Sequence, residues 1–199
     1  MIEPEVQATD AILRRGGIQY VVVGGQAIAR KAATTTRDVD VMVATADYAA
    51  TVVRLRAEPG LAFDWDDGKL CRFRLLGLGG VPLDVINSTV FSGRRTGKEF
   101  FDFLASDGAQ VVDGILYATP TLVWYTRLLT KRWRAYAEKI VTNVIDGVSI
   151  DHLDGVEEVA RRFGTGDEIG PRVAYVREEL RRPEVAALLP PRPGNSAER

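Results

Sequence analysis

The segment from Tyr20 to Val43 constrains this chain most, because it joins two strand-like apolar runs through a diglycine and ends with two closely spaced acids. The first apolar run leads into Gly24-Gly25, an alanine-rich stretch and a second apolar run. This order predicts a strand, a tight turn, a short helix, a loop and a second strand. The second strand carries the two acids, Asp38 and Asp40.

The spacing of the two acids places them on one face of the predicted strand. Successive strand side chains point to opposite faces, so Asp38 and Asp40 project together while Val39, Val41 and Val43 face the core. Adjacent carboxylates repel unless a cation neutralises them, and Mg²⁺ accepts carboxylate oxygens together with water and substrate phosphates. The pair predicts a site for Mg²⁺ (or Mn²⁺). Two acids at a solvated strand end are the alternative.

A third acid follows some forty residues later. Asp84 is the only charged residue in the apolar run from Val81 to Ile86. Because a charged residue is rarely buried without a partner, a strand that places Asp84 beside Asp38 and Asp40 would complete a three-carboxylate cluster. An edge-strand aspartate that faces water is the alternative.

The diglycine predicts a phosphate site. Gly24 and Gly25 let the backbone approach a ligand closely, and the start of the following helix offers free N–H groups and a partial positive charge. No GKS or GKT sequence follows, which excludes a Walker loop. A plain turn is the alternative.

The order GG, short helix, T-R-D-V-D-V and L-D-V-I resembles the DNA polymerase beta-type nucleotidyltransferase superfamily. Thr36 and Arg37 are similar to the lead-in of the AbiEii and MenT-like branch, the toxin side of some bacterial toxin–antitoxin pairs. The resemblance covers Ile18 to Ile86 and extends more loosely to Asp146. It implies an α+β nucleotidyltransferase fold, with a mixed twisted sheet flanked by helices and a C-terminal helical subdomain.

The resemblance also implies an activity and its partners. The chain would move a nucleoside monophosphate from an NTP, such as ATP, to a tRNA 3′ end or a protein hydroxyl, and an antitoxin protein would be a further partner. A catalytically inactive nucleotide-binding or interaction module of the same fold is the alternative.

The resemblance assigns roles to individual residues. Asp38, Asp40 and Asp84 become the metal-binding and catalytic acids. A helical lysine that holds nucleotide phosphate maps to Lys131 as first choice, with a catalytic role, and to Lys139 as second choice. The run from Lys139 to Asp146 matches the family except at Asn143, where an acid is usual; an exposed basic helix face is the alternative. The nucleotide-binding set is Gly24, Gly25, Gln26, Arg37, Lys131, Lys139 and Asp146.

Composition sets the remaining limits. The 199 residues, 46% hydrophobic, suffice for one core, and we expect a nucleotidyltransferase core over 1–118, a helical subdomain over 119–189 and a disordered tail over 190–199. A net charge of −1 gives no overall basic field, although Arg94, Arg95 and Lys98 form a basic loop after the third acid. The single cysteine excludes an internal disulfide framework and a cysteine-based zinc site. No apolar run approaches a membrane span and no signal-peptide pattern is present, so a cytoplasmic location with no membrane partner is expected.

Hydrophobic periodicity predicts helices and strands that alternate early and strands that pair later. The expected helices are 4–15, 26–33, 47–57, 121–136, 137–146, 156–163 and 171–180, and the expected strands besides the one bearing the acids are 18–23, 61–65, 69–76, 81–86 and 115–118. This pattern indicates a mixed sheet with helices packed on it.

Overall fold

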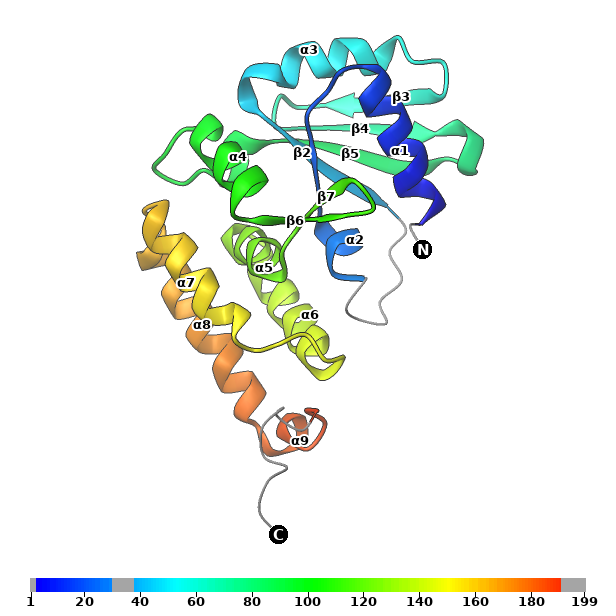
Figure 1. The fold of residues 1–199 in the computed structure, drawn as a ribbon. Coiled ribbons are helices and arrows are strands. Elements are labelled where there is room, and N and C mark those ends of the chain that lie inside the picture. The colour runs from blue at the N-terminus through cyan, green and yellow to red at the C-terminus, as the bar shows by residue number, and fades with distance from the viewer. Residues whose placement is uncertain (1–2, 30–37, 191–199) are drawn as a thin grey trace.

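The computed structural model describes residues 3–29 and 38–190, and their architecture is a seven-stranded mixed sheet with helices (Figure 1). The strand order is β3-β4-β5-β2-β1-β7-β6. The strands are β1 (Val21–Val23), β2 (Val39–Val43), β3 (Leu61–Asp66), β4 (Leu70–Leu75), β5 (Val81–Asn87), β6 (Ala109–Val112) and β7 (Ile115–Ala118). The helices are α1 (Pro4–Arg15), α2 (Gly24–Ala29), α3 (Thr45–Arg56), α4 (Gly97–Ser106), α5 (Pro120–Leu129), α6 (Trp133–Ile145), α7 (His152–Arg162), α8 (Gly166–Arg181) and α9 (Pro183–Ala186).

Strand directions make the sheet mixed. β2 pairs with β5 in parallel and with β1 antiparallel, while β1 pairs with β7 in parallel. The β3–β4–β5 meander and the β6–β7 hairpin complete the two edges. This arrangement confirms the predicted α+β class with a mixed sheet flanked by helices.

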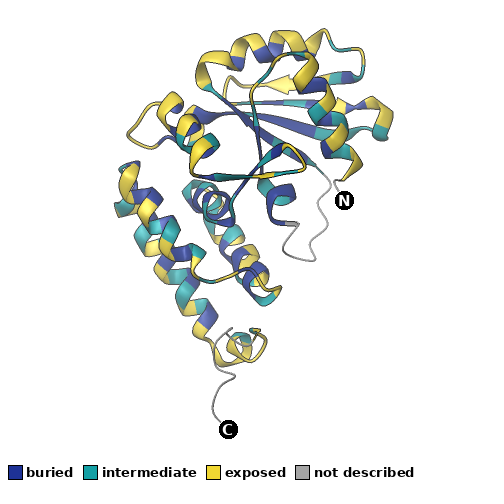
Figure 2. Cartoon of the chain, viewed as in Figure 1, coloured by how far each residue is buried: buried dark blue, intermediate teal, exposed yellow. Residues whose placement is uncertain are grey.

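The central strands are buried as their sequence pattern requires. Val39, Val41 and Val43 of β2 have no solvent exposure, and the alternate residues Leu83 and Val85 of β5 are equally buried. Helices α1 and α3 pack against strands of this half of the sheet. Figure 2 shows the buried strands in dark blue beneath helices whose outer surfaces are exposed. Asp40 and Asp84 project from the opposite face of β2 and β5, so the packing of these valines and Leu83 fixes where the two acids point.

From Pro120 to Ala186 all regular structure is helical. Helix α5 packs against β7 and α2 on the sheet side and against α6, α7 and α8 on the other side. Figure 1 shows these helices gathered at one end of the molecule. The division at 118/119 into a core and a helical subdomain packed on it stays a prediction, and residues 191–199 of the predicted tail lie outside the described residues. No helix formed by residues 3–29 and 38–190 is long and apolar enough to cross a membrane.

The break between the predicted helices 121–136 and 137–146 lies earlier than expected. Helix α5 ends at Leu129 and α6 begins at Trp133. Thr130 is extended, with ψ of 160°. Arg172 of α8 donates hydrogen bonds from Nη1 to the backbone oxygens of Leu128 and Thr130. A distant arginine thus satisfies the carbonyl groups that the helix end leaves free, which local sequence cannot reveal.

Candidate metal and nucleotide site

The three predicted acids converge at the middle of the sheet. Asp40 of β2 and Asp84 of β5 are direct partners in the parallel register, so both side chains project from the same face. Asp38 immediately precedes β2. Each carboxylate offers an oxygen that lies within 4.8 Å of those from the other two. The sheet therefore assembles the cluster from two chain segments that the sequence separates widely.

Gly24 makes room for this cluster. Val23 is opposite Asp40 in the β1–β2 register, and Gly24 follows with φ of +64°, in the left-handed region that favours glycine. A Cβ atom at this position would lie 1.9 Å from Oδ2 of Asp40. Gln26 is buried and its Nε2 lies 3.5 Å from the backbone oxygen of Asp38, to which it donates. The diglycine turn thus admits one acid, and Gln26 holds the backbone of another.

Burial raises the pKa of Asp40 to about 7, and the negative charges of Asp38 and Asp84 add to this effect. The positive charges of Arg127 and Arg72 oppose it. A carboxyl group with this pKa is held where its ionised form lacks a counter-charge. A cation close to Asp40 would therefore favour its ionised form.

Asp84 has a strong cationic partner that the sequence did not reveal. The Nε and Nη2 atoms of Arg72 donate to Oδ1 and Oδ2 of Asp84, both at 2.6 Å. Arg72 lies opposite Asp84 in the β4–β5 register, and the Asp84 side chain is only 7% exposed. This hydrogen bonding raises the pKa of Arg72. The alternation of Arg72 and Arg74 in an otherwise apolar strand is the sequence signal for cations on the face that bears the acids.

A second unpredicted cation, on a helix, interacts electrostatically with the cluster. Arg127 of α5 is half-buried, and its desolvation lowers the pKa of its guanidinium group. The charges of Asp40 and Asp38 act in the opposite direction and raise this pKa. Its Nη1 donates to Oδ1 of the buried Asn143 at 3.3 Å, and its guanidinium carbon lies 5.8 Å from the centre of the Tyr136 ring. No ion pair of Arg127 occurs among residues 3–29 and 38–190. In the sequence it is one of several basic residues near the end of a helix, and nothing distinguishes it.

The other residues predicted to bind the nucleotide are dispersed. Lys131 is exposed in the break between α5 and α6, and Asp146 is exposed at the C-terminal end of α6. Lys139 of α6 is exposed with its Nζ 5.5 Å from the centre of the Tyr136 ring, the ring that Arg127 also approaches. Arg37 lies outside the described residues.

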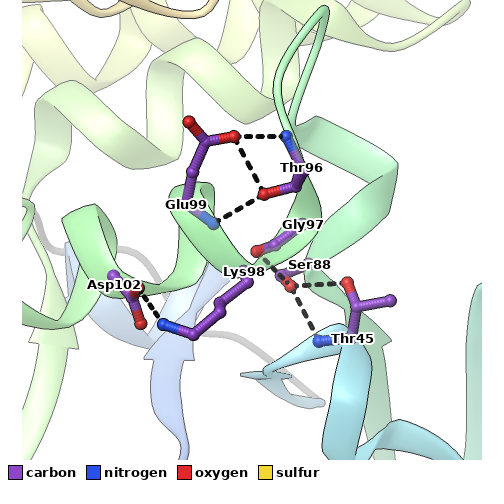
Figure 3. Close-up of polar contacts among 7 residues, drawn as sticks. All are labelled: Thr45, Ser88, Thr96, Gly97, Lys98, Glu99 and Asp102. Atoms are coloured by element: carbon purple, nitrogen blue, oxygen red, sulfur yellow. Dashed lines mark hydrogen bonds and ion pairs between the residues drawn. The ribbon is translucent and has the colours of Figure 1, made fainter.

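The basic loop after the third acid has partners of its own (Figure 3). Asn87 at the end of β5 pairs with Val43, so the loop leaves the sheet three residues beyond the Asp40–Asp84 pair. Figure 3 shows the ion pair between Lys98 and Asp102, one turn apart on α4. Arg95, just before the helix, pairs with Glu99. Figure 3 also shows the Thr96–Glu99 capping box and the Ser88 hydroxyl, which donates to the Gly97 backbone oxygen and receives the backbone N–H of Thr45. These contacts anchor α4 to α3.

The donor set of the cluster fits a hard divalent cation. All three side chains are carboxylates, and oxygen ligands of this kind suit Mg²⁺ and Mn²⁺ rather than metals that prefer thiolates. Burial first, and the charges of Asp38 and Asp84 second, raise the pKa of Asp40 and so disfavour its ionised form. A divalent ion would supply the missing counter-charge.

No family model matches the sequence, and no curated protein matches it. Among solved structures, the chain is similar to an antigenic nucleotidyltransferase-like protein from Paracoccidioides brasiliensis, with 18% identity, a TM-score of 0.48, and coverage of 92% of this chain and 88% of that one. It is also similar to the antibiotic-resistance factor ANT(2'')-Ia, with 13% identity, a TM-score of 0.46 and coverage of 92% of each chain. JHP933 from Helicobacter pylori has 11% identity, a TM-score of 0.40, and coverage of 92% of this chain and 94% of that one. These values are too low for a substrate or an acceptor to be carried over to this chain.

Proposed function

We propose that the chain is a metal-dependent nucleotidyltransferase that moves a nucleoside monophosphate from an NTP to an acceptor hydroxyl. The observation that supports this most is the convergence of Asp38, Asp40 and Asp84 within 4.8 Å next to the Gly24 turn. Three carboxylates so close together, one with its pKa raised to about 7 by burial and by its two neighbours, favour the binding of a divalent counter-ion. Asp38 and Asp40 would hold Mg²⁺ or Mn²⁺ on the triphosphate, and Asp84 would complete a second metal position or accept the proton of the attacking hydroxyl.

The reaction requires one bond to form and one to break at the α-phosphorus. The acceptor oxygen bonds to this phosphorus, its proton passes to a carboxylate, and the bond to the leaving pyrophosphate breaks. A bound divalent ion neutralises charge on the attacking and leaving oxygens. The chain's own contribution is to hold these groups in position, which is the main source of rate in phosphoryl transfer.

We assign the role of phosphate-binding cation to Arg127. It lies on the helical side of the acids, interacts with Asp38 and Asp40 and is oriented by Asn143 and the Tyr136 ring. A fixed guanidinium group that faces a metal site suits a phosphate group, because it offers parallel N–H donors. Lys139 shares the Tyr136 ring and is proposed as a secondary contact, and Lys131 stays a predicted phosphate contact and catalytic residue. Gly24, Gly25, Gln26, Arg37 and Asp146 stay predicted nucleotide contacts.

The acceptor is proposed from the sequence resemblance alone. The similarity to AbiEii and MenT-like proteins favours a tRNA 3′ end or a protein hydroxyl, and an antitoxin that silences the activity would be a partner. Incubation with each α-³²P-labelled NTP, Mg²⁺ and either total tRNA or lysate protein tests both acceptors. Transfer of label to one acceptor by the wild type, lost in Asp40→Asn, supports the proposal. The absence of label on either acceptor, or equal labelling by the variant, contradicts it.

A second candidate is a nucleotide-binding module that does not catalyse. The observation that favours it is the Arg72–Asp84 pair, in which the arginine engages both oxygens of the third acid. Calorimetric binding of an NTP with Mg²⁺ and no transfer to any acceptor would select this function.

A further inference from the structure

The carboxylate of Asp84 is fully engaged by a protein cation. Both oxygens accept hydrogen bonds from Arg72 at 2.6 Å, and the side chain is 7% exposed. A divalent ion that takes Asp84 as a ligand therefore has to bind an oxygen that already accepts a hydrogen bond from a cation, and the two positive charges repel each other. Charge-assisted bidentate pairs are among the strongest hydrogen bonds in proteins, so this competition lowers metal affinity.

The guanidinium group that binds Asp84 also lies at the edge of contact with an aromatic ring, which offers it a place to move closer. Trp65 of β3 is opposite Arg72 in the β3–β4 register, and the ring centre of Trp65 lies 5.9 Å from the guanidinium carbon. The Trp65 side is open to solvent, with 42% of the residue exposed. An aromatic face attracts a guanidinium group that has left its carboxylate. Trp65, Arg72, Asp84 and Asp40 thus form one row across four neighbouring strands.

We infer that Arg72 is a positioning residue that serves as the internal counter-ion of the metal site, holding Asp84 in the metal-free protein and moving toward Trp65 when a divalent ion binds. This inference rests on the proposed metal-binding role of the three acids. Its consequence is that the free ion binds weakly, whereas an ion that arrives with a triphosphate brings further ligands to offset the loss of the pair. Arg72 thereby couples metal occupancy to the presence of the nucleotide.

Calorimetric titration of Mn²⁺ into the nucleotide-free protein at pH 8 tests the inference without any activity measurement. We expect Arg72→Ala and Arg72→Gln to bind Mn²⁺ about tenfold more tightly than the wild type, a factor that corresponds to loss of one competing charged contact. Arg74→Ala is the matched control: it lies two residues along the same strand, pairs with Asp64 and should bind Mn²⁺ as the wild type does. Circular dichroism checks that each variant is folded. If Arg72→Ala does not fold, Arg72→Gln, which keeps much of the side-chain volume, carries the test.

Mg²⁺ titration followed by tryptophan fluorescence tests the movement. The wild type should change its emission as the ion binds, and Trp65→Phe and Arg72→Ala should lose this change. Affinity in the Arg72 variants equal to or lower than that of the wild type overturns the inference and leaves the metal site standing. An unchanged fluorescence response in Trp65→Phe overturns the movement toward Trp65. Absence of Mn²⁺ binding in the wild type and in all variants overturns both the inference and the proposed metal-dependent function.

Discussion

Asp40 and Asp84 are direct register partners in the parallel pair of β2 and β5. Parallel neighbours in register bring their side chains to one face about 5 Å apart, so the two carboxylates face each other at close range. Their repulsion is a feature of the fold itself, since shifting either strand by one residue would place an acid in the core.

The first prediction is stabilisation by a divalent ion. Mg²⁺ or Mn²⁺ relieves the repulsion among the three acids, so protein with free ion at ten or more times the dissociation constant should melt about 2–4 °C higher than protein kept metal-free with EDTA. Asp40→Asn should lose this rise. Asp64→Asn removes the charge of an acid on β3 that pairs with Arg74, away from the cluster, and should keep the rise in melting temperature. Equal rises in the wild type and Asp40→Asn would exclude the cluster as the metal site.

The second prediction concerns pH. The native pKa of Asp40, about 7, is above its ordinary value of 3.8, so the native state binds this proton more tightly than the unfolded chain. The stabilising effect is complete below about pH 4 and is lost as the pH rises through 7. In EDTA, urea unfolding should show Asp40→Asn gaining stability over the wild type between pH 5 and pH 8, by an amount on the order of 2 kcal/mol. A pH-independent difference would show that Asp40 is not the group responsible.

The third prediction tests the close contact at the glycine turn. Gly24→Ala places a methyl group 1.9 Å from Oδ2 of Asp40 and on a backbone with φ of +64°. Stability measured in urea should fall by about 1–3 kcal/mol, and Mn²⁺ binding should weaken as Asp40 is displaced. Gly77→Ala is the control, because no heavy atom lies within 4 Å of the added Cβ; its stability should change by no more than about 0.5 kcal/mol. Undiminished Mn²⁺ affinity in folded Gly24→Ala would separate this turn from the site.

How much of this could be read from the sequence differs between residues. Asp38 and Asp40 follow from a period of two in an apolar strand, and Asp84 stands out because it is the sole charge in an apolar run. The Arg72–Asp84 pair depends on the register of β4 against β5, which sequence periodicity does not fix. The position of Arg127 depends on α5 ending at Leu129, where Arg172 from α8 satisfies its carbonyl groups.

One strand was missed although its signal is present. β6 and β7 form a hairpin whose loop is Asp113-Gly114, and both loop residues have positive φ. A two-residue Asp-Gly loop between apolar runs is typical of a tight β-hairpin. The missed strand extends the edge of the sheet and does not alter the site.

The fourth prediction tests whether Arg127 rather than Lys131 is the main phosphate-binding cation. Arg127→Lys keeps the charge but loses the planar donors, so the dissociation constant of a non-hydrolysable NTP with Mg²⁺, measured by calorimetry, should rise about tenfold, which is 1.4 kcal/mol. Lys131→Ala removes an exposed cation in the α5–α6 break and should change this dissociation constant by less than about threefold. A larger effect at Lys131 would reverse the assignment.

The most direct measurement is anomalous diffraction from crystals grown with Mn²⁺ and a non-hydrolysable NTP. The expected result is a Mn²⁺ peak bonded to oxygens of Asp38 and Asp40, with the triphosphate on the side of Arg127. A nucleotide seen elsewhere, or no Mn²⁺ peak at the three acids under saturating conditions, would contradict metal-dependent nucleotidyl transfer by this chain.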